Sequence, residues 1–307
     1  MKHYPAAIIL TCLICLASLC MTGCQNESES AQPRTAQIDL DSVIESIEIA
    51  DDFKPSVGIV LGSGLSGLAD EVDVVDRISY SDIPGFPQST VAGHKGEYIF
   101  GYLEGIPVVL MNGRIHYYEG YSMEEVVTPD RIMALLGADT VILTCAAGSL
   151  NPDIPPGSLV CINDQITSFI PSPLIGQNDE SLGERFVDMS EPYDRELQKL
   201  LHKAAKKEGI DLKDGIFLQV TGPQYETKAE SEMYASLGAD TVSMSTGCET
   251  LALRHMGVRV LGINCVTNYC PNCSSENFTH DDVQAMADKA GGDMIRLVRW
   301  VLKQMDD

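Results

Sequence analysis

The sequence has few basic residues, and this scarcity limits what the protein can bind. Its 307 residues include 21 Lys and Arg against 44 Asp and Glu, so the formal net charge is -23 at pH 7. Nucleic acid requires a basic surface because its phosphates are negative, and we therefore expect no nucleic acid partner. An anionic lipid surface is disfavoured for the same reason. A small anionic ligand would need a local positive pocket.

The chain also has no internal repeat, and a long apolar run lies at its start. Residues 6–20 are apolar, follow Lys2 and His3, and precede Gly23 and Cys24. This arrangement is typical of a secretory signal rather than a transmembrane span, with an uncleaved membrane anchor as the alternative. A cysteine directly after a glycine resembles a bacterial lipoprotein signal, in which that cysteine carries the lipid.

The lipoprotein pattern defines the expected organisation of the chain. Met21 departs from the Leu that is usual at its position. We expect a signal peptide over 1–23, a lipid on Cys24 and a polar, flexible tether over 24–40. A single domain then covers 41–307. The protein would be anchored in the bacterial cell envelope.

Close cysteine pairs are scarce as well. Among the cysteines after Cys24, only Cys270 and Cys273 lie close together in the sequence. A local disulfide or two unreactive thiols is the preferred interpretation, and an oxidising compartment would allow the disulfide. A redox pair and, together with Cys265, the start of a plant-type iron–sulfur spacing are the alternatives. No ligand cluster calls for a metal ion.

Short apolar runs alternate with segments of helical period along the rest of the chain. Strands are predicted over 57–61, 98–103, 106–111, 139–145, 159–166, 217–220, 241–244 and 258–266. Helices are predicted over 68–72, 122–136, 190–208, 227–237, 248–256 and 281–302, with a kink or break at Pro129. This alternation predicts an α/β fold: one domain with a central, mixed, largely parallel twisted sheet flanked by helices.

A glycine-rich turn follows the first predicted strand. Residues 62–67 read GSGLSG and match the spacing of a dinucleotide fingerprint. That fingerprint also needs an acidic residue after a second strand, and Asp82 lies instead in a proline-rich loop, which argues against nicotinamide binding. A smaller inference survives: the glycines let the backbone approach a ligand, and Ser63 can donate to a phosphate at a helix N-terminus.

Polar side chains gather where the strand over 106–111 ends. Residues 112–121 read NGRIHYYEGY, and such strand ends bind ligands in open α/β sheets. Arg114 and His116 share a face if the chain is extended, and Arg offers a planar fork for phosphate or carboxylate oxygens. This suggests an anion site, with a salt bridge of Arg114 to Glu119 as the alternative.

Seven stretches occur in the order found in one enzyme family. They read GSGLSGL (62–68), STVAGHKG (89–96), GRIHYYEGY (113–121), TCAAGSLN (144–151), GPQYETKAE (222–230), GADTVSMSTGCE (238–249) and CVTNYC (265–270). In these stretches the chain resembles the trimeric purine nucleoside phosphorylases, which cleave purine nucleosides with inorganic phosphate to free base and ribose 1-phosphate. The resemblance covers about residues 57–280 and implies phosphate as a co-substrate, with no cofactor and no metal.

The resemblance implies a role for residues in each stretch. Phosphate would be held by Ser63, His94, Arg114, Ile115, His116, Ala146 and Ser245. The ribose would be lined by Tyr118, Met244 and His280. The purine would be bound by Tyr225, Glu226, Val242 and Asn268. The catalytic residues would be Asn268, His116 and Glu119, the last by orienting His116.

These residues favour one activity over two alternatives. A buried carboxylate at Glu226 would accept from the N1–H of a 6-oxopurine, so inosine and guanosine are the expected substrates. Methylthioadenosine phosphorylase shares the fold, but the resemblance implies that it recognises adenine and has an acidic residue at the position of Asn268. The combination of Glu226 and Asn268 therefore argues against this activity. A non-catalytic nucleoside-binding lipoprotein would not need Arg114 and His116.

The chain departs from the family pattern at several points. Cys145 stands where Asn is usual, Ser149 replaces a Gly, and Gly247-Cys248 replaces a Val-Pro pair. The Cys-Pro-Asn-Cys segment after Asn268 is also unusual. The resemblance further implies a homotrimer in which a neighbouring chain supplies an aromatic residue to each ribose site. Two candidates for that aromatic residue are Phe86 and Phe169, of which Phe169 is favoured.

Overall fold

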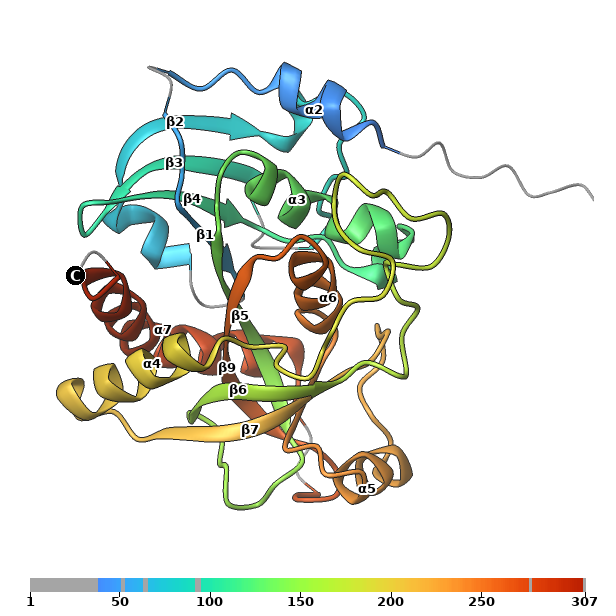
Figure 1. Cartoon of the computed structure of the whole chain (residues 1–307). Helices are drawn as coiled ribbons and strands as arrows, with labels where there is room; N and C mark the ends of the chain where they lie inside the picture. Colours follow the sequence, from blue (N-terminus) through green and yellow to red (C-terminus); the bar gives the residue numbers. More distant parts are fainter. Residues whose placement is uncertain (1–37, 51–52, 63–65, 92–94, 276–277, 306–307) are drawn as a thin grey trace, which may run out of the picture. The chain divides into compact units, whose positions relative to one another are not determined.

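Apolar strands form a mixed sheet at the centre of the fold (Figure 1). The computed structural model describes residues 38–50, 53–62, 66–91, 95–275 and 278–305, all within one unit, Ile38–Asp307. The predicted signal peptide, Cys24, Ser63 and His94 lie outside the described residues. No helix in the described part of the chain is long and apolar enough to cross a membrane.

The described strands pair in the order β2-β3-β4-β1-β5-β8-β7-β6-β9, and a further pairing joins β5 to β9. They are β1 (Val57–Leu61), β2 (Asp73–Ser79), β3 (Glu97–Leu103), β4 (Ile106–Asn112), β5 (Thr140–Ser149), β6 (Leu159–Ile166), β7 (Leu212–Gln219), β8 (Thr241–Ser243) and β9 (Arg259–Tyr269). The pairing of β5 with β9 closes β5, β8, β7, β6 and β9 into a ring. The sheet is mixed and largely parallel, as predicted, because β1–β4, β1–β5, β5–β9, β6–β7 and β7–β8 are all parallel pairs.

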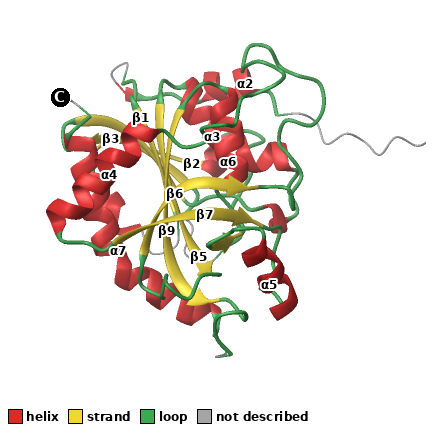
Figure 2. Cartoon of the chain, turned by 60° about the horizontal axis from the view of Figure 1, so that its bottom comes forward, coloured by secondary structure: helices red, strands yellow, loops and turns green. Residues whose placement is uncertain are grey.

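Helices lie on both sides of this sheet (Figure 2). They are α2 (Leu40–Ser46), α3 (Met123–Leu135), α4 (Arg195–Glu208), α5 (Lys228–Ser236), α6 (Gly247–His255) and α7 (His280–Lys303). Short 3-10 turns are η2 (Ser66–Glu71), η3 (Tyr80–Asp82) and η4 (Tyr117–Glu119). The observed fold is therefore the single-domain α/β arrangement that the sequence predicted.

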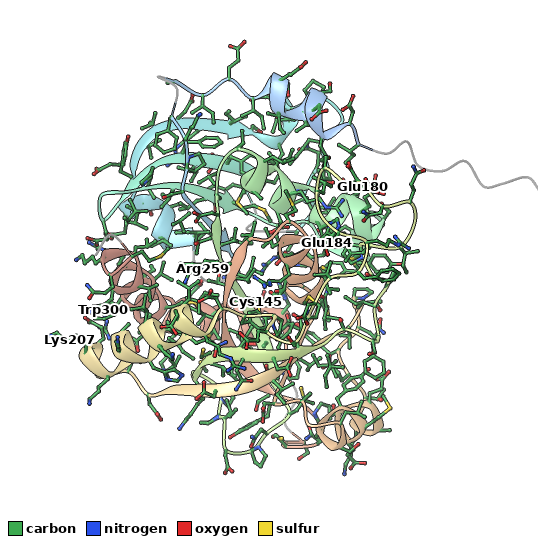
Figure 3. The ribbon with its side chains drawn as sticks, in the orientation of Figure 1. Cys145, Glu180, Glu184, Lys207, Arg259 and Trp300 are labelled. Atoms are coloured by element: carbon green, nitrogen blue, oxygen red, sulfur yellow. The ribbon has the colours of Figure 1, made fainter. Side chains whose placement is uncertain are left out.

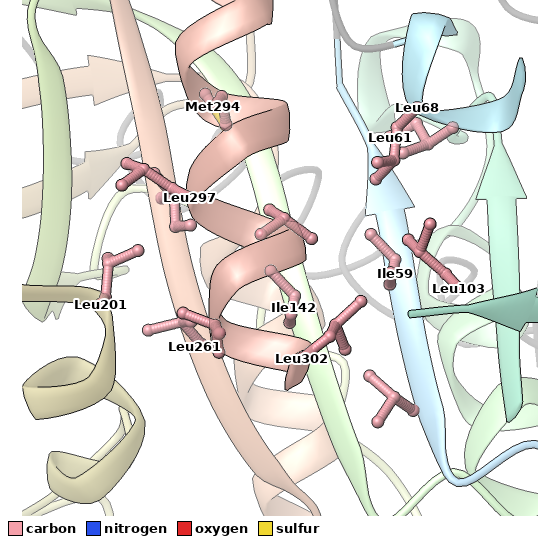
Figure 4. Packing of buried hydrophobic residues seen from close by; sticks show 14 of the residues in the cluster. Ile59, Leu61, Leu68, Leu103, Ile142, Leu201, Leu261, Met294, Leu297 and Leu302 are labelled. Carbon is pink, nitrogen blue, oxygen red and sulfur yellow. The ribbon is translucent and has the colours of Figure 1, made fainter. Parts of the chain in front are cut away.

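The alternation of side chains along β1 separates two hydrophobic clusters. Ile59 and Leu61 point to the side where they join Leu201 of α4 and Leu297 of α7 in one cluster (Figure 4). Val60 points the other way, into a cluster that α3 and α6 also enter. Each such fully buried side chain stabilises the fold by roughly 1.5–3 kcal/mol. Strand periodicity thus explains why both faces of the sheet are covered.

Two helices differ from their predictions: α4 begins later in the chain, and α3 continues through a proline. The helix predicted from residue 190 begins only at Arg195, because the Asp194 side chain accepts from the amides of Glu196 and Leu197. Of the kink or break predicted at Pro129, the break is wrong, since α3 continues through this residue to Leu135. The carbonyl of Pro129 accepts from the hydroxyl of Tyr98.

Two elements were missed in the sequence. β2 is an edge strand whose side chains are largely exposed, so it has no apolar alternation to reveal it. α2 begins at Leu40, inside the segment predicted as a tether. Ile38 and Leu40 pack against the cluster that contains Val60, so these residues belong to the packed unit.

A glycine at the end of β1 allows a close approach to β5. A Cβ added at Gly62 would lie 2.5 Å from the carbonyl oxygen of Thr144 and 2.8 Å from the Cα of Cys145. The amide of Gly62 donates to the Thr144 hydroxyl at 3.0 Å. The sequence predicted that the glycines of this turn let the backbone approach a ligand. At Gly62 the backbone that approaches closely is that of β5.

Candidate active site

A pocket lies at the carboxyl ends of the parallel strands. β1, β4, β5 and β9 run in the same direction, so the segments after them meet at one edge of the sheet. The pocket has a volume of about 300 Å³, at the lower end of the range for small-molecule sites. It is lined by Val91, Arg114, His116, Tyr118, Cys145, Ala146, Ala147, Gly148, Pro223, Tyr225, Glu226, Val242, Ser243, Met244, Ser245, Thr267, Asn268, His280 and Val283.

Most of the predicted site residues therefore meet in one place. The described ones that line the pocket are Arg114, His116, Ala146, Ser245, Tyr118, Met244, His280, Tyr225, Glu226, Val242 and Asn268. Two others do not line it: Glu119 lies behind His116, and Ile115 packs into a hydrophobic cluster with α3 and α6. The individual roles of these residues stay predictions.

A buried ion pair anchors the segment after β4, which carries Arg114. Arg114 is 1% exposed, and its Nε and Nη2 donate to the two carboxylate oxygens of Glu249 at 2.8 and 2.6 Å. Its Nη1 donates to the carbonyl of Thr144 at 2.6 Å. The salt bridge considered between Arg114 and Glu119 is wrong, because Glu249 is the carboxylate that contacts Arg114. Sequence reasoning missed this role of Glu249, which lies 135 residues further along the chain.

His116 is held by the next turn of the chain. Its Nδ1 lies 3.1 Å from Oε1 of Glu119, and its backbone amide donates to the same oxygen at 2.7 Å. Burial lowers the pKa of His116, so its imidazole is neutral at pH 7. Burial alone would raise the pKa of Glu119, but hydrogen bonds from His116 and Thr90 lower it to about 2. Glu119 is therefore an ionised carboxylate that orients a neutral imidazole.

The amide of Asn268 has a defined orientation at the end of β9. The hydroxyl of Thr267 donates to Asn268 Oδ1 at 2.9 Å, and Nδ2 of Asn268 donates to the carbonyl of Tyr269 at 3.3 Å. Because a carbonyl oxygen can only accept, the bond to Tyr269 identifies the NH2 group, which carries the donors of this side chain. Thr267 was not singled out in the sequence, although it precedes Asn268 directly.

Tyrosines and a carboxylate form the outer part of the pocket. The ring of Tyr118 stacks on His116 with centroids 4.8 Å apart, and burial raises the pKa of Tyr118 to about 12. Tyr225 is 40% exposed and meets Phe278 edge-on. Burial raises the pKa of Glu226, which follows Tyr225 in the loop between β7 and α5.

The departures from the family pattern are accommodated by packing. Cys145 lies in the interior (Figure 3), and burial raises the pKa of its thiol to about 11. The amide of Cys248 donates to Oε1 of Gln219 at 2.7 Å, a bond that a proline at this position could not make. A Cβ added at the preceding Gly247 would lie 3.0 Å from the same oxygen. The six cysteines of the described residues are free thiols. Of the two preferred interpretations of Cys270 and Cys273, the local disulfide is therefore not formed, and the two residues are separate thiols.

One group of described residues away from the pocket could hold a metal ion. Ligand atoms of Cys161, His202 and Asp214 lie within 4.8 Å of one another. Cys161 and Asp214 are paired in the register of β6 and β7. Nε2 of His202, on α4, lies 2.9 Å from Oδ1 of Asp214. Three ligands are one short of a closed tetrahedral zinc site, and two of these are exposed. The sequence did not predict this cluster, and we assign it no role in the pocket.

Comparison with known proteins identifies the class. Residues 56–303 match the Phosphorylase superfamily, and the chain belongs to this family. It is 45% identical to purine nucleoside phosphorylase 1 of Geobacillus stearothermophilus over 251 residues, which are 82% of this chain and 92% of that protein. It is 43% identical to the purine nucleoside phosphorylase of Mus musculus over 224 residues, 71% of this chain and 77% of that protein.

Solved structures agree with this assignment. The fold matches the purine nucleoside phosphorylase of Schistosoma mansoni in complex with inosine with a TM-score of 0.80 and 37% identity, covering 86% of this chain and 95% of that chain. The same protein in complex with adenosine matches with a TM-score of 0.80, 37% identity, and coverage of 86% and 96%.

The Arg114–Glu249 pair makes a testable contribution to stability. We expect Glu249→Gln to lower the free energy of unfolding by about 3–5 kcal/mol, because it leaves a buried guanidinium without its counter-charge. Glu196→Gln is a matched control, since Glu196 pairs with Lys199 on an exposed face and should change stability by less than about 1 kcal/mol. Urea unfolding of both variants measures the difference. Equal effects would contradict the structural role of the buried pair.

Proposed function

We propose that this protein is a purine nucleoside phosphorylase, which converts a purine nucleoside and phosphate to the free purine and ribose 1-phosphate. One observation carries the proposal: a single pocket is lined both by Arg114, His116 and Ser245 and by Glu226 and Asn268. The first set suits a small anion, and the second suits the edge of a purine. The sequence relatives, which are purine nucleoside phosphorylases, support the same activity.

The anion-binding set relies on oriented donors more than on net charge. Glu249 balances the charge of Arg114, and His116 is neutral at pH 7. Arg, His and hydroxyl donors fixed in a buried site can still bind phosphate oxygens strongly, because little reorganisation is needed. The local positive pocket expected from the sequence is thus a pocket of preorganised hydrogen-bond donors.

The base-binding set suits the charge that develops during the reaction. Cleaving an N-glycosidic bond builds positive charge on the ribose and negative charge on the leaving purine. Phosphate oxygens stabilise the ribose, and the NH2 group of Asn268 can donate to N7 of the purine. Holding both reactants in line contributes several kcal/mol, on the order of 7 or more in favourable cases.

The Glu226 carboxylate favours 6-oxopurines. It can accept from N1–H of hypoxanthine, and from N1–H and the 2-amino group of guanine. Adenine has no N1–H to donate to this carboxylate, and the lost hydrogen bond costs about 1–3 kcal/mol. We therefore propose inosine and guanosine as the preferred substrates.

Base release by the purified protein tests this function. We expect release from inosine and guanosine that requires inorganic phosphate, with release from adenosine lower by about 10-fold or more. The measurement is free base formed with and without phosphate, using a chain that begins after Cys24. Preference for an adenine nucleoside would favour a methylthioadenosine phosphorylase, and nucleoside binding without turnover would favour a binding lipoprotein.

We propose further that the enzyme is a homotrimer in which Phe169 completes the ribose site of a neighbouring chain. Phe169 is 37% exposed and contacts Tyr234 at a centroid distance of 5.1 Å. The other candidate, Phe86, is 5% exposed and packs against Tyr80 and Tyr98 in the core. Phe86 is therefore not accessible to a second chain.

Complementation between two inactive variants tests this arrangement. We expect Phe169→Ala and Asn268→Ala each to lose most activity alone, because each breaks every site of a uniform trimer. Co-expression should restore activity, since some sites then combine intact Asn268 with an intact Phe169 from the neighbouring chain. Phe186→Ala is the control, because Phe186 is 89% exposed and should be silent. Absence of restored activity, with a trimer seen by light scattering, would reject Phe169 as the shared residue.

We also propose that Cys24 carries a lipid that anchors the enzyme in the bacterial cell envelope. The support is the apolar run over 6–20 and the Gly23-Cys24 junction. Salvage of external nucleosides is the use that this location suggests.

Fractionation of cells tests the anchor. We expect the natural chain to sediment with membranes and to incorporate labelled fatty acid, whereas Cys24→Ser should lose the label and the membrane association. Cys273→Ser is the control, because it removes a thiol from the folded unit and leaves the signal unchanged. A natural chain found in the cytosol without label would reject the anchor and the location together.

A further inference from the structure

We propose that Cys270 positions the Glu226 carboxylate for recognition of the purine. The inference rests on the proposed phosphorylase function and concerns a residue of the Cys-Pro-Asn-Cys segment that directly follows β9. Cys270 does not line the pocket itself, so its effect would pass through Glu226.

The backbone around Cys270 is held on both sides. Its amide donates to the carbonyl of Ser149 at 2.8 Å, which extends the pairing of β9 with β5 by one residue. Its carbonyl accepts from the amides of Cys273 and Ser274 at 2.9 and 3.2 Å. A turn therefore follows Cys270 directly, and these hydrogen bonds hold the backbone from which its side chain extends.

The thiol of Cys270 contacts the carboxylate of Glu226. The sulfur lies 3.9 Å from Oε2 of Glu226, a distance at which a thiol can donate weakly. Burial raises the pKa of Cys270, so the sulfur keeps its proton and can act as a donor. Within the described residues, this thiol is the side chain that donates to the carboxylate of Glu226.

A glycine of the pocket wall makes this contact possible. A Cβ added at Gly148 would lie 2.7 Å from the sulfur of Cys270 and 3.3 Å from Nδ2 of Asn268. Gly148 thus leaves room for the thiol behind the base-binding residues. The glycine at position 148 and the thiol of Cys270 are therefore complementary in shape.

Burial raises the pKa of Glu226, and the nearby charge of Glu230 acts in the same direction. The backbone amide of Glu226 and the Cys270 thiol lower this pKa, so the thiol is one of two donors that favour the charged carboxylate. Tyr225 and Tyr234 also lie close enough to interact with its charge. Removing the thiol donor should therefore raise the pKa of Glu226 further, so that Glu226 becomes protonated at a higher pH.

The two preferred substrates should depend on Cys270 to different extents. Inosine presents only N1–H to the carboxylate, so the orientation of Glu226 must come from the protein. Guanosine presents N1–H and a 2-amino group, and these two donors can orient the carboxylate themselves. A positioning role therefore predicts a larger loss for inosine than for guanosine when the thiol is removed.

Three variants of the full chain, kept reduced, test the proposal. We expect Cys270→Ala to lower kcat/KM for inosine by about 5-fold and for guanosine by less than about 2-fold, as suits one weak hydrogen bond. The acid limb of the inosine pH profile should move to higher pH. Cys270→Ser supplies a hydroxyl donor and should restore most of both properties. Cys273→Ala removes a neighbouring thiol for which no contact with Glu226 is seen, and should leave both unchanged.

The ratio of inosine to guanosine kcat/KM is the deciding quantity, because a partly unfolded preparation lowers both values equally. An active natural enzyme whose ratio and acid limb are unchanged in Cys270→Ala would overturn the positioning role alone. Equal losses in Cys270→Ser and Cys270→Ala would also overturn it, since a donor would then not matter. A natural enzyme without phosphorolysis would reject the proposed function and this inference with it.

Discussion

The buried pair of Arg114 and Glu249 is the interaction on which the site depends. Arg114 follows β4, Glu249 belongs to α6, and the Thr144 carbonyl that Arg114 also contacts belongs to β5. Three elements are thus joined at one guanidinium. Because an unpaired charge would be costly at 1% exposure, the segment after β4 has little freedom to move. His116 and Tyr118 lie in the same segment, so the Arg114–Glu249 pair also helps to hold them in place.

The sheet supplies the complementary half of the pocket. The ring of β5, β8, β7, β6 and β9 brings Ser243, Met244 and Ser245 next to the end of β5, where Ser243 donates to the Ala146 carbonyl at 2.7 Å. β9 places Asn268 opposite Gly148 in the register. The segment that follows β4, the end of β5 and the end of β9 therefore contribute residues to one pocket.

Several unusual residues of this chain make paired contacts with one another or with the site. Gly247 and Cys248 fit against Gln219, and Gly148 leaves room for Cys270. The members of each pair are complementary in shape or hydrogen bonding, so the fit of one residue depends on the other. Cys248 and Cys270 themselves do not line the pocket.

The sequence alone was sufficient for most of the main elements and for naming most of the residues that meet in the pocket, whose individual roles stay predictions. Apolar runs identified β1, β4 and β6, and motif order identified Glu226 and Asn268, because residue type and short spacing are local properties. Tertiary structure decided the rest. Glu249 meets Arg114, and Cys270 meets Glu226, only because the fold brings together segments that are far apart in the sequence. The exposed strand β2 carries no burial pattern at all, and it is held by pairing with β3. Periodicity reports which side of an element is buried, whereas the packing of the whole chain determines what that side contacts.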